Sequence, residues 1–306
     1  QMVLALGIAH STKAAELGEA VGISFDPYDI HIMNKNFDTY VDLAWTNSTT
    51  IEQWGVLLAK QRLSEQELWD FGNNIISDNI YRCDTVSSNP CRIVKLRTNS
   101  TYWIYVRSLC GNIISEWSYP ISFHTACEVK TPLDLGVESF ENYGLGQSFA
   151  PDCYIVGNNG GVDKPNYVPY CLGGAAYAHT GRGSLLINST ATGTSPRNGA
   201  YAITPRMDVE DISKLRMRFW GSTGGSSYAT SKYAKSIVVG VVTDPTRLAT
   251  FEPVDTLYFD GEVRPYEVYF SNYESDYLGG KGKYVMFLSE FSLDNRVCID
   301  DIEFDF

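Results

Sequence analysis

Short segments in which every second residue is apolar run through most of this 306-residue sequence. In residues 39–45 the apolar positions are Val41, Leu43 and Trp45, and residues 215–220 repeat the same period. A period of two places alternate side chains on opposite faces of a β-strand, whereas a helix needs a period of about 3.6. Few stretches show the helical period, and 26 Gly with 12 Pro supply turns. The sequence therefore predicts an all-β fold.

The predicted strands form two groups, which suits the two domains expected of a chain of this length. The first group comprises residues 29–33, 39–45, 54–59, 92–96, 102–107 and 121–125. The second group comprises residues 137–141, 183–187, 200–203, 215–220, 236–242, 266–270, 283–288 and 297–304. We expect a smaller domain over 25–127, a linker over 128–136 and a larger domain over 137–306. Residues 1–24 stay unassigned, because 7–20 suit either a helix or the remnant of a preceding module.

The smaller domain carries residues typical of an immunoglobulin-like sandwich. Tyr102 begins an alternating strand six residues after Leu96, and such a tyrosine can hydrogen-bond back to the preceding corner. With Pro27, Trp45 and the Ser-Glu-Trp-Ser run at 115–118, these residues resemble a fibronectin type III domain. The resemblance implies that Trp45 is the core tryptophan of the second strand and that Tyr102 forms the corner.

An insert over residues 62–91 departs from the fibronectin type III pattern. Within it, residues 64–71 predict a helix, because Ser64 and Glu67 have the spacing of a capping box. The insert makes this loop unusual but leaves the predicted domain unchanged.

The second group of strands suits two packed sheets with the order of a jelly roll. The motifs that carry a family resemblance lie at residues 139–141, 181–185, 203–207, 239–245, 250–254 and 299–302. They resemble the jelly-roll domains of Bacteroidetes surface proteins. Relatives of those domains include the cleaved-adhesin domains of gingipain-type haemagglutinins, carbohydrate-binding modules and MAM domains. The resemblance implies a binding domain and does not name its ligand.

Six of the seven cysteines fall in sequence order as neighbours that would close short loops. The predicted disulfides are Cys83 with Cys91, Cys110 with Cys127, and Cys153 with Cys171. The second pair resembles the fibronectin type III variant of secreted Bacteroidetes proteins. Disulfides imply an oxidising, extracellular setting, and the alternative is buried thiols in a cytosolic protein. No CxxC is present, so the usual zinc spacing is absent, and we expect Cys298 to be a small core residue.

The jelly-roll resemblance also implies one structural calcium ion where the first and last strands meet. Glu141 and Asp300 match the ligand positions of the family, and Asp301 or Glu138 would assist. Calcium prefers carboxylate and carbonyl oxygens, which these residues supply. The alternative is that the acidic residues over 300–305 form a solvated edge that deters pairing with other chains.

A candidate ligand surface lies on the strand at residues 215–220. Its period of two places Arg216, Arg218 and Trp220 on one face, with Tyr228 nearby in sequence. A sugar ring can stack on an aromatic side chain while arginines donate hydrogen bonds to its hydroxyls. The alternative is that Trp220 covers the edge of the core and the two arginines pair with surface acids.

Charge and motifs exclude several classes of function. Lys and Arg total 24 against 36 Asp and Glu, a net charge of −12, which argues against nucleic acid and against an anionic membrane surface. The longest apolar runs, 3–9 and 237–242, are far shorter than the roughly 20 residues that span a bilayer, so we expect no membrane insertion. No GxSxG, HExxH or phosphate-loop motif occurs, so we expect no enzyme, although paired carboxylates for glycoside hydrolysis stay open.

These observations predict a non-catalytic binding protein for adhesion or glycan recognition, which is secreted or attached at the outer-membrane surface. Its expected partner is a glycan or a host or matrix protein, recognised by the jelly roll. One alternative is an accessory region of a secreted protease or glycoside hydrolase whose catalytic domain lies outside this chain. Another is a structural stalk that recognises nothing. Gln1 follows no charged signal-peptide segment, so we expect a trimmed or mature form.

Overall fold

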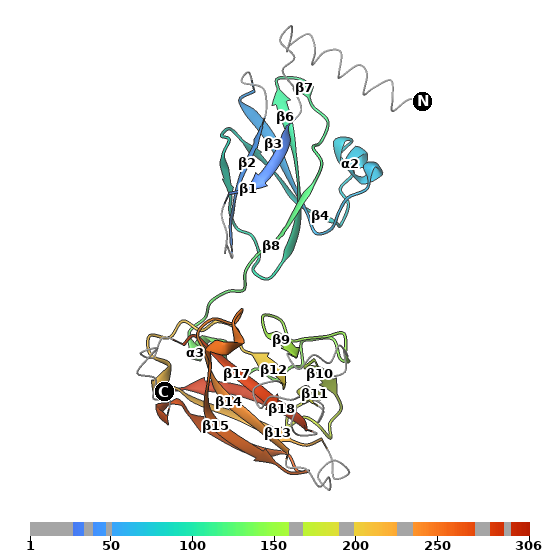
Figure 1. Ribbon diagram of the computed structural model, residues 1–306. Helices are drawn as coiled ribbons and strands as arrows, with labels where there is room; N and C mark the ends of the chain where they lie inside the picture. The colour runs from blue at the N-terminus through green and yellow to red at the C-terminus, as the bar shows by residue number, and fades with distance from the viewer. Residues whose placement is uncertain are drawn as a thin grey trace. The chain divides into compact units, whose positions relative to one another are not determined.

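A computed structural model shows two compact units, Gln1–Glu128 and Val129–Phe306 (Figure 1). The structure describes residues 27–33, 39–46, 51–158, 168–189, 199–224, 235–272, 282–290 and 295–306. The unassigned residues 1–24 lie outside these ranges. Within them, no helix combines the length and the apolar character needed to cross a membrane.

The described residues of the first unit form two antiparallel sheets. One has the strand order β1-β2-β5, and the other has the order β4-β3-β6-β7 with β8 paired to the start of β6. The strands of the first sheet are Tyr28–Ile32, Val41–Thr46 and Cys91–Ile93. The strands of the second sheet are β4 (Ile80–Val86), β3 (Gln53–Ala59), β6 (Thr101–Cys110), β7 (Ile113–Ile114) and β8 (Ile121–His124). The predicted immunoglobulin-like sandwich is confirmed.

The core of this unit lies between the two sheets. Trp45 on β2 and Trp54 on β3 meet edge to face, with ring centroids 5.5 Å apart. The hydroxyl of the buried Tyr102 accepts a 2.9 Å hydrogen bond from the backbone N–H of Arg97. Because this bond ties the start of β6 to the segment before it, the predicted tyrosine corner is confirmed.

The insert contributes helix α2 (Glu65–Gly72) and strand β4. The predicted capping box is present, since the Ser64 hydroxyl accepts a hydrogen bond from the Glu67 N–H and the Glu67 carboxylate accepts one from the Ser64 N–H. These two bonds satisfy donors that the first turn of a helix leaves free. Strand β4 was not predicted from the sequence; it is an edge strand with several polar residues.

In the residues that the structure describes, the second unit is a larger sandwich of two five-stranded antiparallel sheets. One sheet, which we call the β13 sheet, contains in spatial order β10 (Tyr170–Gly173), β11 (Gly183–Asn188), β18 (Arg296–Asp305), β13 (Arg216–Ser222) and β16 (Arg264–Tyr269). The other, the β14 sheet, contains in spatial order β15 (Phe251–Phe259), β14 (Lys235–Val242), β17 (Tyr284–Glu290), β12 (Gly199–Ile203) and β9 (Ile155–Asn158). From β11 to β14 each strand crosses to the other sheet, as in a jelly roll. The predicted fold class is confirmed.

The second core fills the space between these two sheets. Phe219 on β13 and Phe287 on β17 meet edge to face with centroids 5.7 Å apart. Both rings are almost completely buried, and such pairs hold two sheets in one relative position. The outer face of β13 is therefore presented on a rigid support.

The residues predicted to form a linker are structured. Pro132–Leu135 forms the short helix α3, and the Thr131 hydroxyl caps it by accepting a hydrogen bond from the Asp134 N–H. Lys130 bridges Met207 within the second unit. The predicted strand at 137–141 is reduced to an isolated bridge between Glu138 and Ile302.

The predicted cysteine pairs do not form. Cys127 and Cys153 are disulfide-bonded. The free thiols are Cys83, Cys91, Cys110, Cys171 and Cys298. The structure thus has one disulfide where the sequence order suggested three. Cys171 packs into the core of the second unit, and Cys298 is buried, as predicted for a small core residue.

Strand geometry explains why two of those pairs are absent. Cys83 lies opposite Leu57, whose side chain packs on the outer side of its sheet, whereas Cys91 packs in the core between the sheets. Cys110 ends β6, and Cys127 follows β8, which pairs with the start of β6. At about 3.3 Å per residue, roughly 30 Å of strand separates these two cysteines, and a disulfide cannot span that distance.

Candidate functional site

The outer face of β13 carries three residues of the predicted ligand surface. Arg216, Arg218 and Trp220 are partly exposed, whereas Met217 and Phe219 between them are buried in the core. The alternation that the sequence predicted for this strand is confirmed. Whether the outward residues bind a ligand stays a prediction.

Tyr228, which the sequence places near this strand, lies outside the described residues.

Carboxylates of the neighbouring strand β18 hold both arginines. Arg216 Nε lies 2.8 Å from Asp305 Oδ1 and its Nη2 lies 2.7 Å from Oδ2, a two-pronged pair. Arg218 Nη2 lies 3.0 Å from Asp305 Oδ2 and 3.1 Å from Glu303 Oε1. The hydrogen bond from Arg216 lowers the pKa of Asp305, so this carboxylate stays ionised. The arginines do pair with surface acids, as one interpretation of the sequence proposed.

His179, which was not predicted from the sequence as a site residue, stacks on Trp220. The imidazole ring of His179 stacks on the indole, with centroids 3.6 Å apart and planes 3° from parallel. His179 Nδ1 lies 2.7 Å from Asp301 Oδ2, and this contact fixes the orientation of the ring. One face of Trp220 is therefore occupied, and the His179 side chain, 35% exposed, is the ring that meets solvent there.

Three carboxylates hold the loop at 179–183 in place. Asp300 Oδ2 accepts hydrogen bonds from the backbone N–H groups of residues 179 and 180, at 2.7 and 3.0 Å. Glu141 Oε1 accepts hydrogen bonds from those of residues 182 and 183. Asp301 Oδ1 accepts one from the hydroxyl of residue 180 at 2.8 Å. The structure thus brings the three residues predicted to bind calcium to a single loop.

A β-bulge allows two adjacent residues of β18 to reach this loop. The register between β13 and β18 shifts between Arg218 and Trp220, and Asp301 has a left-handed φ of 49°. In a regular strand the side chains of Asp300 and Asp301 would point to opposite faces. The bulge removes that alternation locally, so both carboxylates bond to residues 179 and 180.

The donor chemistry of these carboxylates fits calcium. Burial, and then the neighbouring Asp301 carboxylate, raise the pKa of Asp300 to about 6. Among the described residues, however, no three His, Cys, Asp or Glu side chains are close enough together to hold a metal ion. Calcium binding stays a prediction.

Tyr269 on β16 extends the same outer face and was not named from the sequence. It lies opposite Arg216 in the strand pairing and is 48% exposed. Its hydroxyl donates a 2.7 Å hydrogen bond to Glu267, which restrains the ring. The face therefore presents aromatic rings at two places, with Arg–carboxylate pairs on the strands between them.

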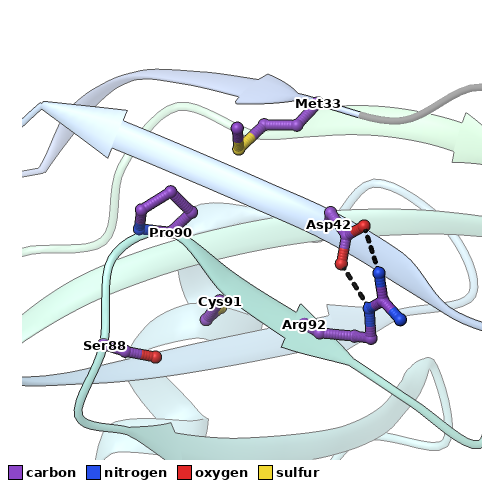
Figure 2. A pocket seen from close by; sticks show the side chains of 6 residues that line it. All are labelled: Met33, Asp42, Ser88, Pro90, Cys91 and Arg92. Atoms are coloured by element: carbon purple, nitrogen blue, oxygen red, sulfur yellow. Dashed lines mark hydrogen bonds and ion pairs between the residues drawn. The ribbon is translucent and has the colours of Figure 1, made fainter.

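The first unit has an open depression of about 460 Å³ (Figure 2). Its lining residues are Met33, Asp42, Ser88, Pro90, Cys91 and Arg92. Arg92 Nε lies 2.6 Å from Asp42 Oδ1 and its Nη2 lies 2.8 Å from Oδ2, and these bonds lower the pKa of Asp42. Burial raises the pKa of Cys91 to about 11. At neutral pH the depression thus contains a neutralised ion pair and a protonated thiol, neither of which suits acid–base or nucleophilic chemistry.

The other buried free thiols are also protonated at neutral pH. Burial raises the pKa values of Cys171 and Cys298 to about 12. A nucleophilic cysteine needs the thiolate, which a lowered pKa supplies. Neither residue has the environment of a reactive cysteine.

No protein-family model and no curated protein matches this sequence. Among solved structures, the K1 cleaved adhesin domain of Lys-gingipain from Porphyromonas gingivalis W83 is 18% identical, with 55% of this chain and 96% of that one covered and a TM-score of 0.39. The K2 cleaved adhesin domain of Lys-gingipain is 16% identical, with coverages of 56% and 97% and a TM-score of 0.41. The fn3 domain of the human collagen alpha-1(XX) chain is 17% identical, with coverages of 36% and 92% and a TM-score of 0.27. Similarities of this size do not indicate what the chain binds.

Proposed function

We propose that this chain is a non-catalytic extracellular binding protein whose second unit recognises a glycan through the outer face of the β13 sheet. The observation that carries the proposal is the set of outward side chains on rigid paired strands. These are Arg216, Arg218, Tyr269 and the stacked pair of Trp220 and His179.

The chemistry of this face suits a ligand with both apolar ring faces and many hydroxyls. His179, supported from behind by Trp220, and Tyr269 offer exposed aromatic surfaces. The ion pairs of Arg218 use its Nη2 group, and a guanidinium has five N–H donors, so others remain for ligand oxygens. Because carboxylates already hold the arginines, less conformational entropy is lost when a ligand binds.

An extracellular location is supported by the covalent chemistry of the chain. Cys127 and Cys153 are disulfide-bonded, and disulfides persist in oxidising compartments. The net charge of −12 suits a soluble surface that avoids nucleic acid and anionic membranes. We propose that the protein is secreted or attached at the outer-membrane surface.

We also propose a structural calcium ion at Glu141, Asp300 and Asp301. The support is that all three carboxylates bond to one loop and that carboxylate oxygens are ligands that calcium prefers. A bound ion would stabilise the loop that carries His179, and its role would be structural.

The binding proposal is tested by applying the purified chain to a glycan array and to a panel of host matrix proteins. We expect retention on a subset of glycans. Retention only on matrix proteins would replace the glycan with a protein ligand, and blank results on both surfaces would remove the binding function.

A further inference from the structure

A second exposed surface lies on the first unit, at α2 and the turn that follows it. Trp69, Ile75 and Ile76 form what we call the α2 patch, and their exposed fractions are 43%, 60% and 71%. The Ile75 N–H donates a 2.8 Å hydrogen bond to the Asp70 carbonyl, which folds the turn back against the helix. Figure 1 shows α2 outside the sandwich, next to β4.

The α2 patch stands on a firmly attached support. Leu68 and Phe71, three residues apart on the helix, turn inward and pack on the outer side of the β3–β4–β6 sheet. The Glu67 carboxylate accepts hydrogen bonds of 2.9 Å from the Ser77 hydroxyl and 2.7 Å from the Asn79 amide. These contacts join the helix to the segment that enters β4, so the patch is held in a defined conformation.

The apolar side chains of the patch contribute little to the fold. Each keeps more than two fifths of its surface in water, and none belongs to the buried clusters of the unit. Neighbouring exposed apolar residues in an ordered segment are typical of interaction sites, and tryptophan is frequent among the residues that dominate binding energy. The insert therefore supplies a preformed apolar contact surface.

Charge around the patch selects the kind of partner. Residues 64–79 contain Glu65, Glu67, Asp70 and Asp78 and no Lys or Arg. Two basic residues precede this segment, and one of them, Lys60, donates to the Asp78 carbonyl. A second copy of this chain, also at −12, would place like charges together, and an anionic membrane would be repelled. We infer that the α2 patch docks an amphipathic segment of another protein whose apolar face is flanked by Lys or Arg.

The test uses a fluorescein-labelled amphipathic helical peptide of Leu and Lys, with a Leu–Glu peptide of the same pattern for comparison. Fluorescence anisotropy is measured against the full chain and against the double variant Ile75→Ser/Ile76→Ser, which keeps every charge. We expect the double variant to bind the Leu–Lys peptide at least about tenfold more weakly, because the peptide can no longer bury the two isoleucine side chains on binding. The matched control is Tyr28→Ser/Met33→Ser, which removes two similarly exposed side chains from β1 and from the residue that follows it, and it should leave binding unchanged.

A second pair of variants tests the charge requirement. Glu65→Gln/Asp78→Asn should weaken Leu–Lys binding and reduce its dependence on salt concentration. Equal binding of the Leu–Lys peptide to wild type and to Ile75→Ser/Ile76→Ser overturns the inference, because it attributes binding to general charge. Equal binding of the Leu–Glu peptide also overturns it. Self-association in analytical ultracentrifugation that the isoleucine double variant abolishes would identify a second copy as the occupant instead.

Discussion

Replacing Tyr102 with Phe isolates one hydrogen bond of the first unit. The hydroxyl accepts the 2.9 Å bond from the Arg97 N–H, and the side chain is almost completely buried. Phenylalanine keeps the ring and so keeps its stacked contact with Phe123, whose centroid lies 5.6 Å away. The substitution therefore removes the tyrosine corner and leaves the surrounding core packed.

The expected loss follows from the N–H group left behind. A buried donor without an acceptor costs about 1 to 3 kcal/mol. Arg97 itself is exposed, so water can reach part of this backbone, and we expect about 1 kcal/mol, at the lower end of that range. For a domain of this size, such a loss lowers the melting temperature by about 4–8 °C.

Tryptophan fluorescence measures this change within the intact chain. Five of the six tryptophans, at positions 45, 54, 69, 103 and 117, lie in the first unit, so the signal follows mainly that unit. Tyr119→Phe is the matched control, because it removes a hydroxyl from a side chain that is 91% exposed. Equal melting midpoints for Tyr102→Phe and Tyr119→Phe would refute the assigned role of the corner.

Three further predictions concern calcium, thiols and pH. Calcium at about 100 times its dissociation constant should stabilise the second unit by about 2.7 kcal/mol, and a melting midpoint unaffected by chelator would contradict the site at Glu141 and Asp300. Alkylation of the denatured, unreduced chain should label five cysteines, and mass spectrometry showing one labelled cysteine would restore the three predicted disulfides. Hydrogen bonds from Ser64, Asn79 and Ser77 lower the pKa of Glu67 from 4.5 to about 2. Its contribution to stability is thus complete above about pH 5 and is lost as the pH falls through about 2. Glu67→Gln should therefore reduce the loss of stability that the protein shows as the pH falls from about 5 to about 2. An equal loss of stability in wild type and variant would contradict this role of Glu67.

Local patterns in the sequence predicted the parts of the fold that depend on local geometry. The period of two placed Arg216, Arg218 and Trp220 on one face, because strand side chains alternate wherever a strand forms. The capping box and the tyrosine corner were found because each joins residues within six positions of one another. Apart from the two-residue β7, the strands that were missed are β4, β9, β10 and β15, and all lie at sheet edges. Edge strands have one unpaired side, where polar residues and proline are tolerated, so their hydrophobic alternation is weak.

The site residues that were missed depend on contacts between distant segments. His179 lies 41 positions before Trp220 in a turn without periodicity, and the Asp300 and Asp301 contacts place its ring. The motif at residues 181–185 did mark this loop in the sequence, and the structure gives a physical reason for its glycine. Gly181 has a φ of +56°, and a Cβ there would lie 2.4 Å from the Glu141 carboxyl carbon. The predicted disulfide pairs were wrong for the same reason that His179 was missed, because disulfide bonding follows distance in space and not order in sequence.

Recognition of a glycan by the outer face of the β13 sheet can be tested directly, by comparing side chains on the two sheets of the second unit. Affinity for the strongest glycan of the array should be measured by calorimetry for wild type, His179→Ala, Tyr269→Ala and Tyr258→Ala. Tyr258 is the control, since it is 66% exposed on β15 of the opposite sheet. We predict a loss of about tenfold for each of the first two variants, from removal of an aromatic contact, and no change for Tyr258→Ala. Loss of affinity in Tyr258→Ala alone, or unchanged affinity in all three variants, would contradict recognition by the outer face of the β13 sheet.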